Sequence, residues 1–176
     1  MRKRVACTLV AAGLVLLFLP AQAFGQEFGD TMTESRLFNV EMGFLTGYRL
    51  GDEETVVGRT AALNFAIMEN AEIGVVNTQF NIEGGVAGDM HGYNLVRFNY
   101  FFNEQVALSI ATGGWQDDAG NSAAAGSVGG NFVILRNIPD NGLSSTLKAN
   151  VQYLMNDNDG AGEGTFAVSL LGTIGL

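Results

Sequence analysis

Apolar and polar residues alternate one by one along the C-terminal stretch from Gly164 to Leu176. Large apolar side chains share the even positions: Phe166, Val168, Leu170, Ile174 and Leu176. Small and hydroxyl side chains share the odd ones: Thr165, Ala167, Ser169 and Thr173. A period of two predicts a β-strand with one apolar and one polar face. An apolar strand of this length with a free edge would promote aggregation, which favours closure into a barrel.

Seven earlier segments show the same alternation, which predicts eight strands in all. They lie within residues 37–48, 57–67, 71–80, 95–100, 105–111, 127–134 and 143–153. The third is the least regular, because Val76 breaks the parity of Ile73 and Val75. Long connections, such as 81–91 and 115–122, alternate with short turns such as that at Pro139. We therefore predict an all-β, eight-stranded antiparallel up-and-down barrel over residues 37–176.

The N-terminal residues have the composition of an export signal rather than of a folded segment. A basic start at residues 2–4 precedes an apolar run at 5–19 and an Ala-Gln-Ala site at 21–23. These are the three parts of a cleaved secretory signal peptide, here residues 1–23. An uncleaved membrane anchor is the alternative. Residues 24–36 then form a short periplasmic lead-in segment, and loss of Cys7 with the signal leaves no cysteine for a disulfide.

The charge that remains after cleavage is strongly negative. The chain has 9 Lys and Arg and 18 Asp and Glu, so removing the three basic residues of the signal leaves about −12. A balance of this sign argues against nucleic acid as a partner. No later segment reaches the roughly 18 apolar residues that a membrane-spanning helix needs.

The polar face of the predicted strands favours a membrane barrel over a soluble, secreted ligand-binding barrel. A solvated exterior carries many charges, whereas this face is mostly Gly, Ala, Ser, Thr and Asn. Its few charges are Glu41, Glu72, Arg97 and Lys148. Small uncharged residues suit the inside of a narrow barrel, and the apolar parity then faces lipid. The predicted barrel is therefore transmembrane.

Two groups of residues are candidate functional positions. Aromatic residues near the predicted strand ends suit the membrane interfaces: Tyr48, Tyr93, Tyr100, Phe102 and Trp115. Ordinary core packing is the alternative for them. Glu41, Arg97 and Lys148 fall at similar heights, so we predict an ion-paired network across the lumen, with Glu72 nearer the short turns. Burial of an unpaired charge would be costly; side chains that meet water in an incompletely filled lumen are the alternative.

The signal peptide, the eight alternating segments and the rhythm of turns and loops resemble the small eight-stranded outer-membrane barrels of the OmpA/OmpX/OmpW-like group. The resemblance covers residues 37–176 and rests on pattern. It implies an outer-membrane location, contact with outer-membrane lipid, and insertion by the outer-membrane assembly machinery. It also implies periplasmic termini and extracellular acidic loops. The chain ends in Ile174-Gly175-Leu176, whereas such barrels usually end in an aromatic residue; this departure concerns assembly.

The predicted function is a structural or surface-interaction role, with a lumen largely closed by the charge network. A narrow conduit for small molecules is the alternative, and a lipid-modifying outer-membrane enzyme is less favoured. His91-Gly92-Tyr93 departs from the His-x-Ser pair of one such enzyme family, so we interpret His91 as a solvated loop residue and predict no catalytic residues. Residues 157–160 do not fit a calcium loop, because the twelfth position would be Phe166. We therefore predict no metal and no cofactor, and the sequence identifies no surface partner.

Overall fold

The computed structural model of the chain describes residues 37–51, 53–82, 90–137, 144–158 and 164–175. The predicted signal peptide, the lead-in segment and the turn at Pro139 lie outside the described residues. The described part is all β-structure, in eight strands: β1 (Phe38–Arg49), β2 (Glu54–Met68), β3 (Ala71–Ile82), β4 (Met90–Phe101), β5 (Val106–Asp117), β6 (Ser122–Asn137), β7 (Ser144–Asn156) and β8 (Thr165–Gly175). Within these ranges no helix is long and apolar enough to cross a membrane.

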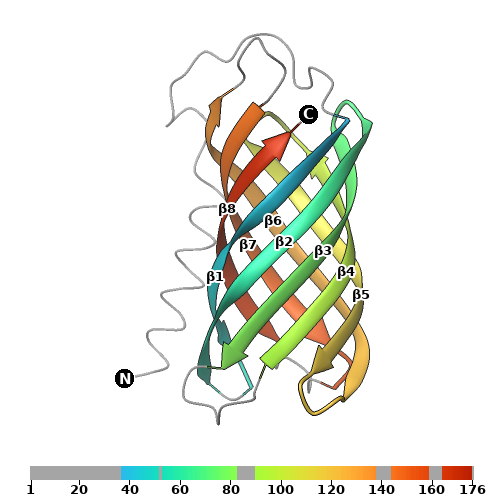
Figure 1. Ribbon diagram of the computed structural model, residues 1–176, viewed down its shortest axis with the longest axis vertical. Helices are drawn as coiled ribbons and strands as arrows, with labels where there is room; N and C mark the ends of the chain where they lie inside the picture. Colours follow the sequence, from blue (N-terminus) through green and yellow to red (C-terminus); the bar gives the residue numbers. More distant parts are fainter. Residues whose placement is uncertain (1–36, 52, 83–89, 138–143, 159–163, 176) are drawn as a thin grey trace. The chain divides into compact units, whose positions relative to one another are not determined.

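The strands pair in sequence order and close into one antiparallel barrel (Figure 1). β8 pairs with both β7 and β1, so that Gly175 lies opposite Ser144 on one side and Asn39 on the other. Closure gives the apolar C-terminal strand a partner along each edge, which removes the aggregation hazard. The predicted eight-stranded up-and-down barrel is confirmed.

The two ends of the barrel differ in the connections that they carry. We call the end where β1 passes into β2 the loop-side end, and the end where β2 passes into β3 the turn-side end. β1 starts and β8 finishes at the turn-side end, which lies uppermost in Figure 1. At this end, Asn103 Oδ1 accepts hydrogen bonds from the backbone N–H groups of Gln105 and Val106, which fixes the turn between β4 and β5.

The predicted long loop at 115–122 is wrong, because β5 runs to Asp117 and β6 starts at Ser122. A hydrogen-bonded turn at residues 118–121 joins them. Both carboxylate oxygens of Asp117 accept from Asn121, at 2.8 Å each, and Gly120 adopts a positive φ of 88°. An aspartate at the start of a turn and a glycine in the left-handed region are ordinary turn chemistry. Asp117, Gly120 and Asn121 therefore indicate a tight turn rather than a long loop.

The alternation in β3 is irregular, and the structure shows which of its residues face inward. Ile73 and Val75 point outward, at 41% and 57% exposed, whereas Val76 points inward at 6%. Phe80 and Ile82 follow Val76 inside. Both faces of β3 are therefore apolar in part of the strand, which is why its alternation is weak in the sequence.

Candidate functional site

Three charged side chains from three strands meet inside the barrel. Arg97 Nη2 on β4 donates to Glu41 Oε2 on β1 at 2.5 Å, and Lys148 Nζ on β7 donates to Glu41 Oε1 at 2.8 Å. The three residues are 6%, 2% and 5% exposed, in the order Arg97, Glu41, Lys148. Each carboxylate oxygen thus has its own cationic donor, and charge-assisted hydrogen bonds of this kind are among the strong ones. We call these residues the charge cluster.

Arg97 also connects the charge cluster to a chain of asparagine side chains. Its Nη2 donates to Asn64 Oδ1 at 2.7 Å, and Asn64 Nδ2 donates to Asn39 Oδ1 at 2.7 Å. Asn39 Nδ2 then donates to Glu72 Oε1 at 2.9 Å. Glu72 is therefore linked to the charge cluster only through amides, and none of the ion pairs among the described residues includes it.

The asparagine chain continues around the far side of the lumen. Asn99 Nδ2 donates to the other oxygen of Glu72 at 3.4 Å, Asn131 Nδ2 to Asn99 Oδ1 at 3.3 Å, and Asn150 Nδ2 to Asn131 Oδ1 at 2.9 Å. An amide both donates and accepts, so a row of amides can satisfy one another in a low-dielectric interior. These asparagines recur on the polar parity of their strands, but uncharged amides on that parity are not by themselves a site signal in the sequence.

A second cluster, apolar and aromatic, fills the loop-side half of the lumen. Its members come from all parts of the wall and are nearly or fully buried: Leu45, Val56, Phe80, Ile82, Tyr93, Leu95, Trp115, Ala125, Leu154 and Ala167. We call this set the aromatic cluster. The interior therefore changes along the barrel axis, from a polar and charged layer to an apolar one.

Tyr93 and Trp115 are not interfacial, which corrects the prediction for them. They lie opposite each other on β4 and β5 and point into the lumen, at 2% and 6% exposed. Tyr93 shares its parity with Arg97, and Trp115 shares its parity with Ser109, so the sequence already marked both as inward positions. Proximity to a strand end was the weaker criterion, because a barrel interior is wide enough to take large side chains.

The other three predicted interfacial aromatics lie on the outer surface. Tyr100 and Phe102 are 40% and 60% exposed, and their rings form an edge-to-face pair with centroids 5.5 Å apart. Tyr48 is half-buried on the outward parity of β1. These positions suit a membrane interface, where amphipathic rings lie at the headgroup level.

His91 is a strand residue with a buried side chain, not the solvated loop histidine that we predicted. Trp115 Nε1 donates to His91 Nδ1 at 3.0 Å, and the imidazole ring stacks on Phe80 with centroids 5.5 Å apart. The ring is 8% exposed. The group that Trp115 presents to His91 is an indole N–H, which is a donor and not a nucleophile. Among the described residues, no group of three or more His, Cys, Asp or Glu side chains is placed to hold a metal ion.

The outer surface also changes character along the axis. Its turn-side half exposes an apolar band that includes Val40, Met42, Phe65, Ile73, Val75, Val96, Leu108, Ile110, Leu170 and Ile174. On the loop-side halves of β3, β4 and β5, the outward residues are instead mainly amides and hydroxyls: Asn77, Gln79, Asn81, Asn94, Thr112 and Gln116. We call these six residues the polar wall. On this side of the barrel, the turn-side half is therefore polar inside and apolar outside, whereas the loop-side half is apolar inside and polar outside.

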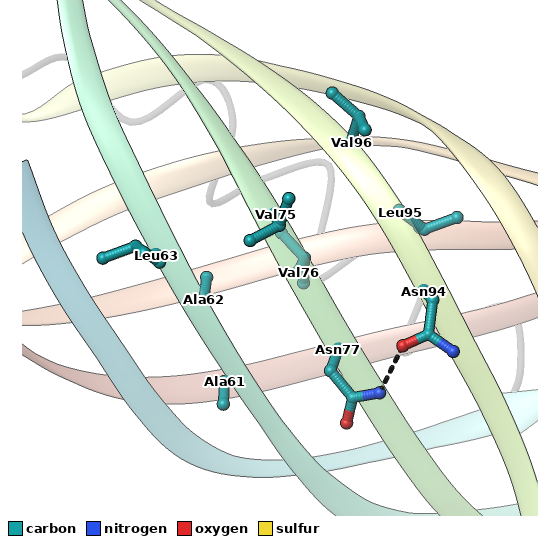
Figure 2. A pocket seen from close by; sticks show the side chains of 9 residues that line it. All are labelled: Ala61, Ala62, Leu63, Val75, Val76, Asn77, Asn94, Leu95 and Val96. Atoms are coloured by element: carbon teal, nitrogen blue, oxygen red, sulfur yellow. Dashed lines mark hydrogen bonds between the residues drawn. The ribbon is translucent and has the colours of Figure 1, made fainter.

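A shallow groove marks the boundary between the apolar band and the polar wall. It spans β2, β3 and β4, with a volume of about 630 Å³. Figure 2 shows the short side chain of Ala61 at this groove and the hydrogen bond from Asn77 Nδ2 to Asn94 Oδ1. This bond is 2.7 Å long. Two residues nearer the loop-side end on β2 and β3, Arg59 donates to Gln79 Oε1 through two nitrogens, at 3.2 and 2.9 Å. Outward polar side chains here satisfy one another in pairs.

No protein-family model matches the chain, and no curated protein matches it. Among solved structures, a chain from the de novo design of transmembrane β-barrels is similar over 81% of this chain and 98% of its own, at 10% identity and a TM-score of 0.48. The crystal structure of Ail, the attachment invasion locus protein of Yersinia pestis, is similar over 78% of this chain and 96% of its own, at 15% identity and a TM-score of 0.44. Neither similarity indicates what this chain binds or does, and the barrel is established by its own strand pairing.

Proposed function

We propose that this chain is an outer-membrane β-barrel protein with a structural or surface-interaction role and a lumen closed to general diffusion. The observation that carries the proposal is the position of Glu41, which bonds both Arg97 and Lys148 from the inside of the wall. An eight-stranded barrel is only wide enough for side chains to fill it. Side chains that bridge β1, β4 and β7 therefore occupy the cross-section that a solute would need.

The outer surface supports a membrane position for the turn-side half of the barrel. A continuous outward display of residues such as Phe44, 81% exposed, and Met42, 66% exposed, is unfavourable in water and favourable in hydrocarbon. We place the apolar band in the lipid and the polar wall outside it, on the loop side. Short turns on the periplasmic side are the habit of such barrels, so the loop-side end faces the cell exterior and both termini lie in the periplasm.

The part exposed to the exterior is then polar and acidic. Described acidic residues near the loop-side end are Glu53, Glu54, Asp117, Asp118 and Asp157. Such a surface repels polyanions and favours cations or basic partners. Together with the amides of the polar wall, it offers many hydrogen-bonding groups and no catalytic constellation among the described residues. This chemistry suits surface interaction better than catalysis.

The test combines location with permeability. Membrane fractionation and gel mobility with and without heating should give a membrane-bound, heat-modifiable protein; a soluble periplasmic monomer would exclude the proposal. Planar-bilayer recordings should then show no large steady conductance for the wild type. Glu41→Ala should increase conductance events if the charge cluster takes part in closure. A large wild-type conductance that Glu41→Ala leaves unchanged would favour a conduit for small molecules instead.

A further inference from the structure

We propose that His91 and Trp115 form an acid-sensitive latch, in which protonation of His91 breaks the bond from Trp115 and loosens the aromatic cluster. The effect on the barrel rests on the proposed closed lumen, because loosening the aromatic cluster would open the loop-side half of that lumen. The latch itself rests on the contacts of two side chains. It would make closure of the lumen dependent on the acidity of the surroundings.

The hydrogen bond between the two rings defines the protonation state of the closed form. Trp115 Nε1 can only donate, so His91 Nδ1 must accept and must carry no proton. The imidazole is therefore neutral, with its proton on Nε2. Ring contacts hold it in this orientation: Phe80 stacks on it with an interplanar angle of 13°, and the Trp115 ring lies 5.4 Å away, centroid to centroid. Both partners are less than a tenth exposed.

Protonation reverses this arrangement. The imidazolium carries N–H groups on both nitrogens, so Nδ1–H would face the indole N–H, donor against donor. The added charge would also lie against the apolar side chains of the aromatic cluster, and burial disfavours a charge. The ring must then turn away or water must reach it. Either movement separates His91 from Trp115 and exposes the indole.

Among the described residues of β3, β4 and β5, three observations concern the charged and titratable groups near His91. On β5, Asp117 lies directly opposite His91 in the register, and its carboxylate is bonded to Asn121. On β4 itself, the phenol of Tyr93 accepts from Asn156 Nδ2 at 3.1 Å. On the other neighbour, β3, the loop-side residues from Val76 to Ile82 carry no charge. Among the described residues of these strands, Asp117 is thus the anion toward which an imidazolium would turn, and burial opposes the charge.

The chain supplies its own reporters, because it contains a single tryptophan and a single histidine. We would refold the full chain in detergent micelles and record Trp115 emission and acrylamide quenching between about pH 8 and pH 5, where histidine titrates. NMR of the imidazole would give the protonation of His91 in the same samples. We expect a reversible red shift and stronger quenching at low pH, with the same midpoint as the imidazole signal.

Two variants separate the latch from other acid effects. His91→Gln offers an amide oxygen that accepts at every pH, so the emission change should disappear. Asp117→Asn removes the carboxylate that lies opposite His91 in the register, so the change should remain. The latch is wrong if His91→Gln keeps the wild-type change, if Asp117→Asn abolishes it, or if the wild type shows no change over this range. If His91→Gln does not fold, differing wild-type midpoints for Trp115 and His91 would overturn the latch, and coincident ones support it. None of these readouts depends on the bilayer conductance.

Discussion

Lys148 Nζ lies 2.8 Å from Glu41 Oε1, although 107 residues separate the two in the sequence. Barrel closure explains the contact, because β8 pairs with β7 on one side and with β1 on the other. Only β8 therefore lies between the strand of Lys148 and the strand of Glu41 around the wall. Arg97 reaches the same carboxylate from β4. One acidic side chain therefore joins the first and last parts of the barrel to its middle.

Glu41→Gln should strongly destabilise the barrel, because it leaves the buried cations of Arg97 and Lys148 without their counter-charge. Loss of one partner of a buried ion pair costs about 3–5 kcal/mol of the free energy of unfolding. Urea unfolding in lipid vesicles, followed by Trp115 fluorescence, measures the change. Glu104→Gln is the matched control: its pair with Arg136 is long, at 3.8 Å, and more exposed, so we expect less than about 1 kcal/mol. Equal losses for the two variants would contradict a special role for Glu41.

Leu108→Lys and Gln116→Lys place the same charge at two heights on the outward face of β5. Leu108 is 44% exposed in the apolar band, and Gln116 belongs to the polar wall. In a bilayer, a lysine at the midplane costs about 2–4 kcal/mol and one near the interface about 0–1 kcal/mol. Unfolding in vesicles should therefore show a large loss for Leu108→Lys only. In a soluble barrel both exposed positions would tolerate lysine, so two small losses would contradict the membrane position.

Gly74→Ala should destabilise the polar layer of the lumen. A Cβ at Gly74 would clash with Asn64 Oδ1, the atom that Arg97 bonds, and with the backbone oxygen of Leu63. Overpacking of this kind costs about 1–3 kcal/mol. On β4, Gly92→Ala is the control, because its Cβ would meet only Gln116 O, at 3.6 Å. Denaturant unfolding of both variants checks this; a Gly74→Ala protein as stable as Gly92→Ala would show that the asparagine chain can rearrange.

The proposed orientation can be read by cysteine labelling of intact cells, since Cys7 lies in the predicted signal peptide. Ala119→Cys is exposed in the loop-side turn between β5 and β6, and Asn137→Cys is exposed at the turn-side end of β6. A membrane-impermeant maleimide should label the first and reach the second only after permeabilisation. The reverse pattern would invert the topology.

The sequence alone predicted the strands, their number and the inward residues of most of them. This was possible because side-chain direction in a strand alternates with a period of two, which is a local property. The same parity placed Glu41, Arg97 and Lys148 on inward positions. The same parity also places Tyr93 and Trp115 on inward positions. Their burial follows this parity, whereas their nearness to the strand ends wrongly indicated an interfacial position.

Other features were decided only by the tertiary structure. Which inward residues touch depends on register and closure, and both are set by pairing between distant strands. The asparagine chain through Asn64 and Asn39 exists because the register of the neighbouring strands β1 and β2 places those amides opposite each other. The exchange of polarity along the axis was hidden for a related reason. The alternation along one strand shows which side chains face the lumen. The height at which aromatic rings or ions lie in the lumen depends on how side chains from all eight strands share its limited volume.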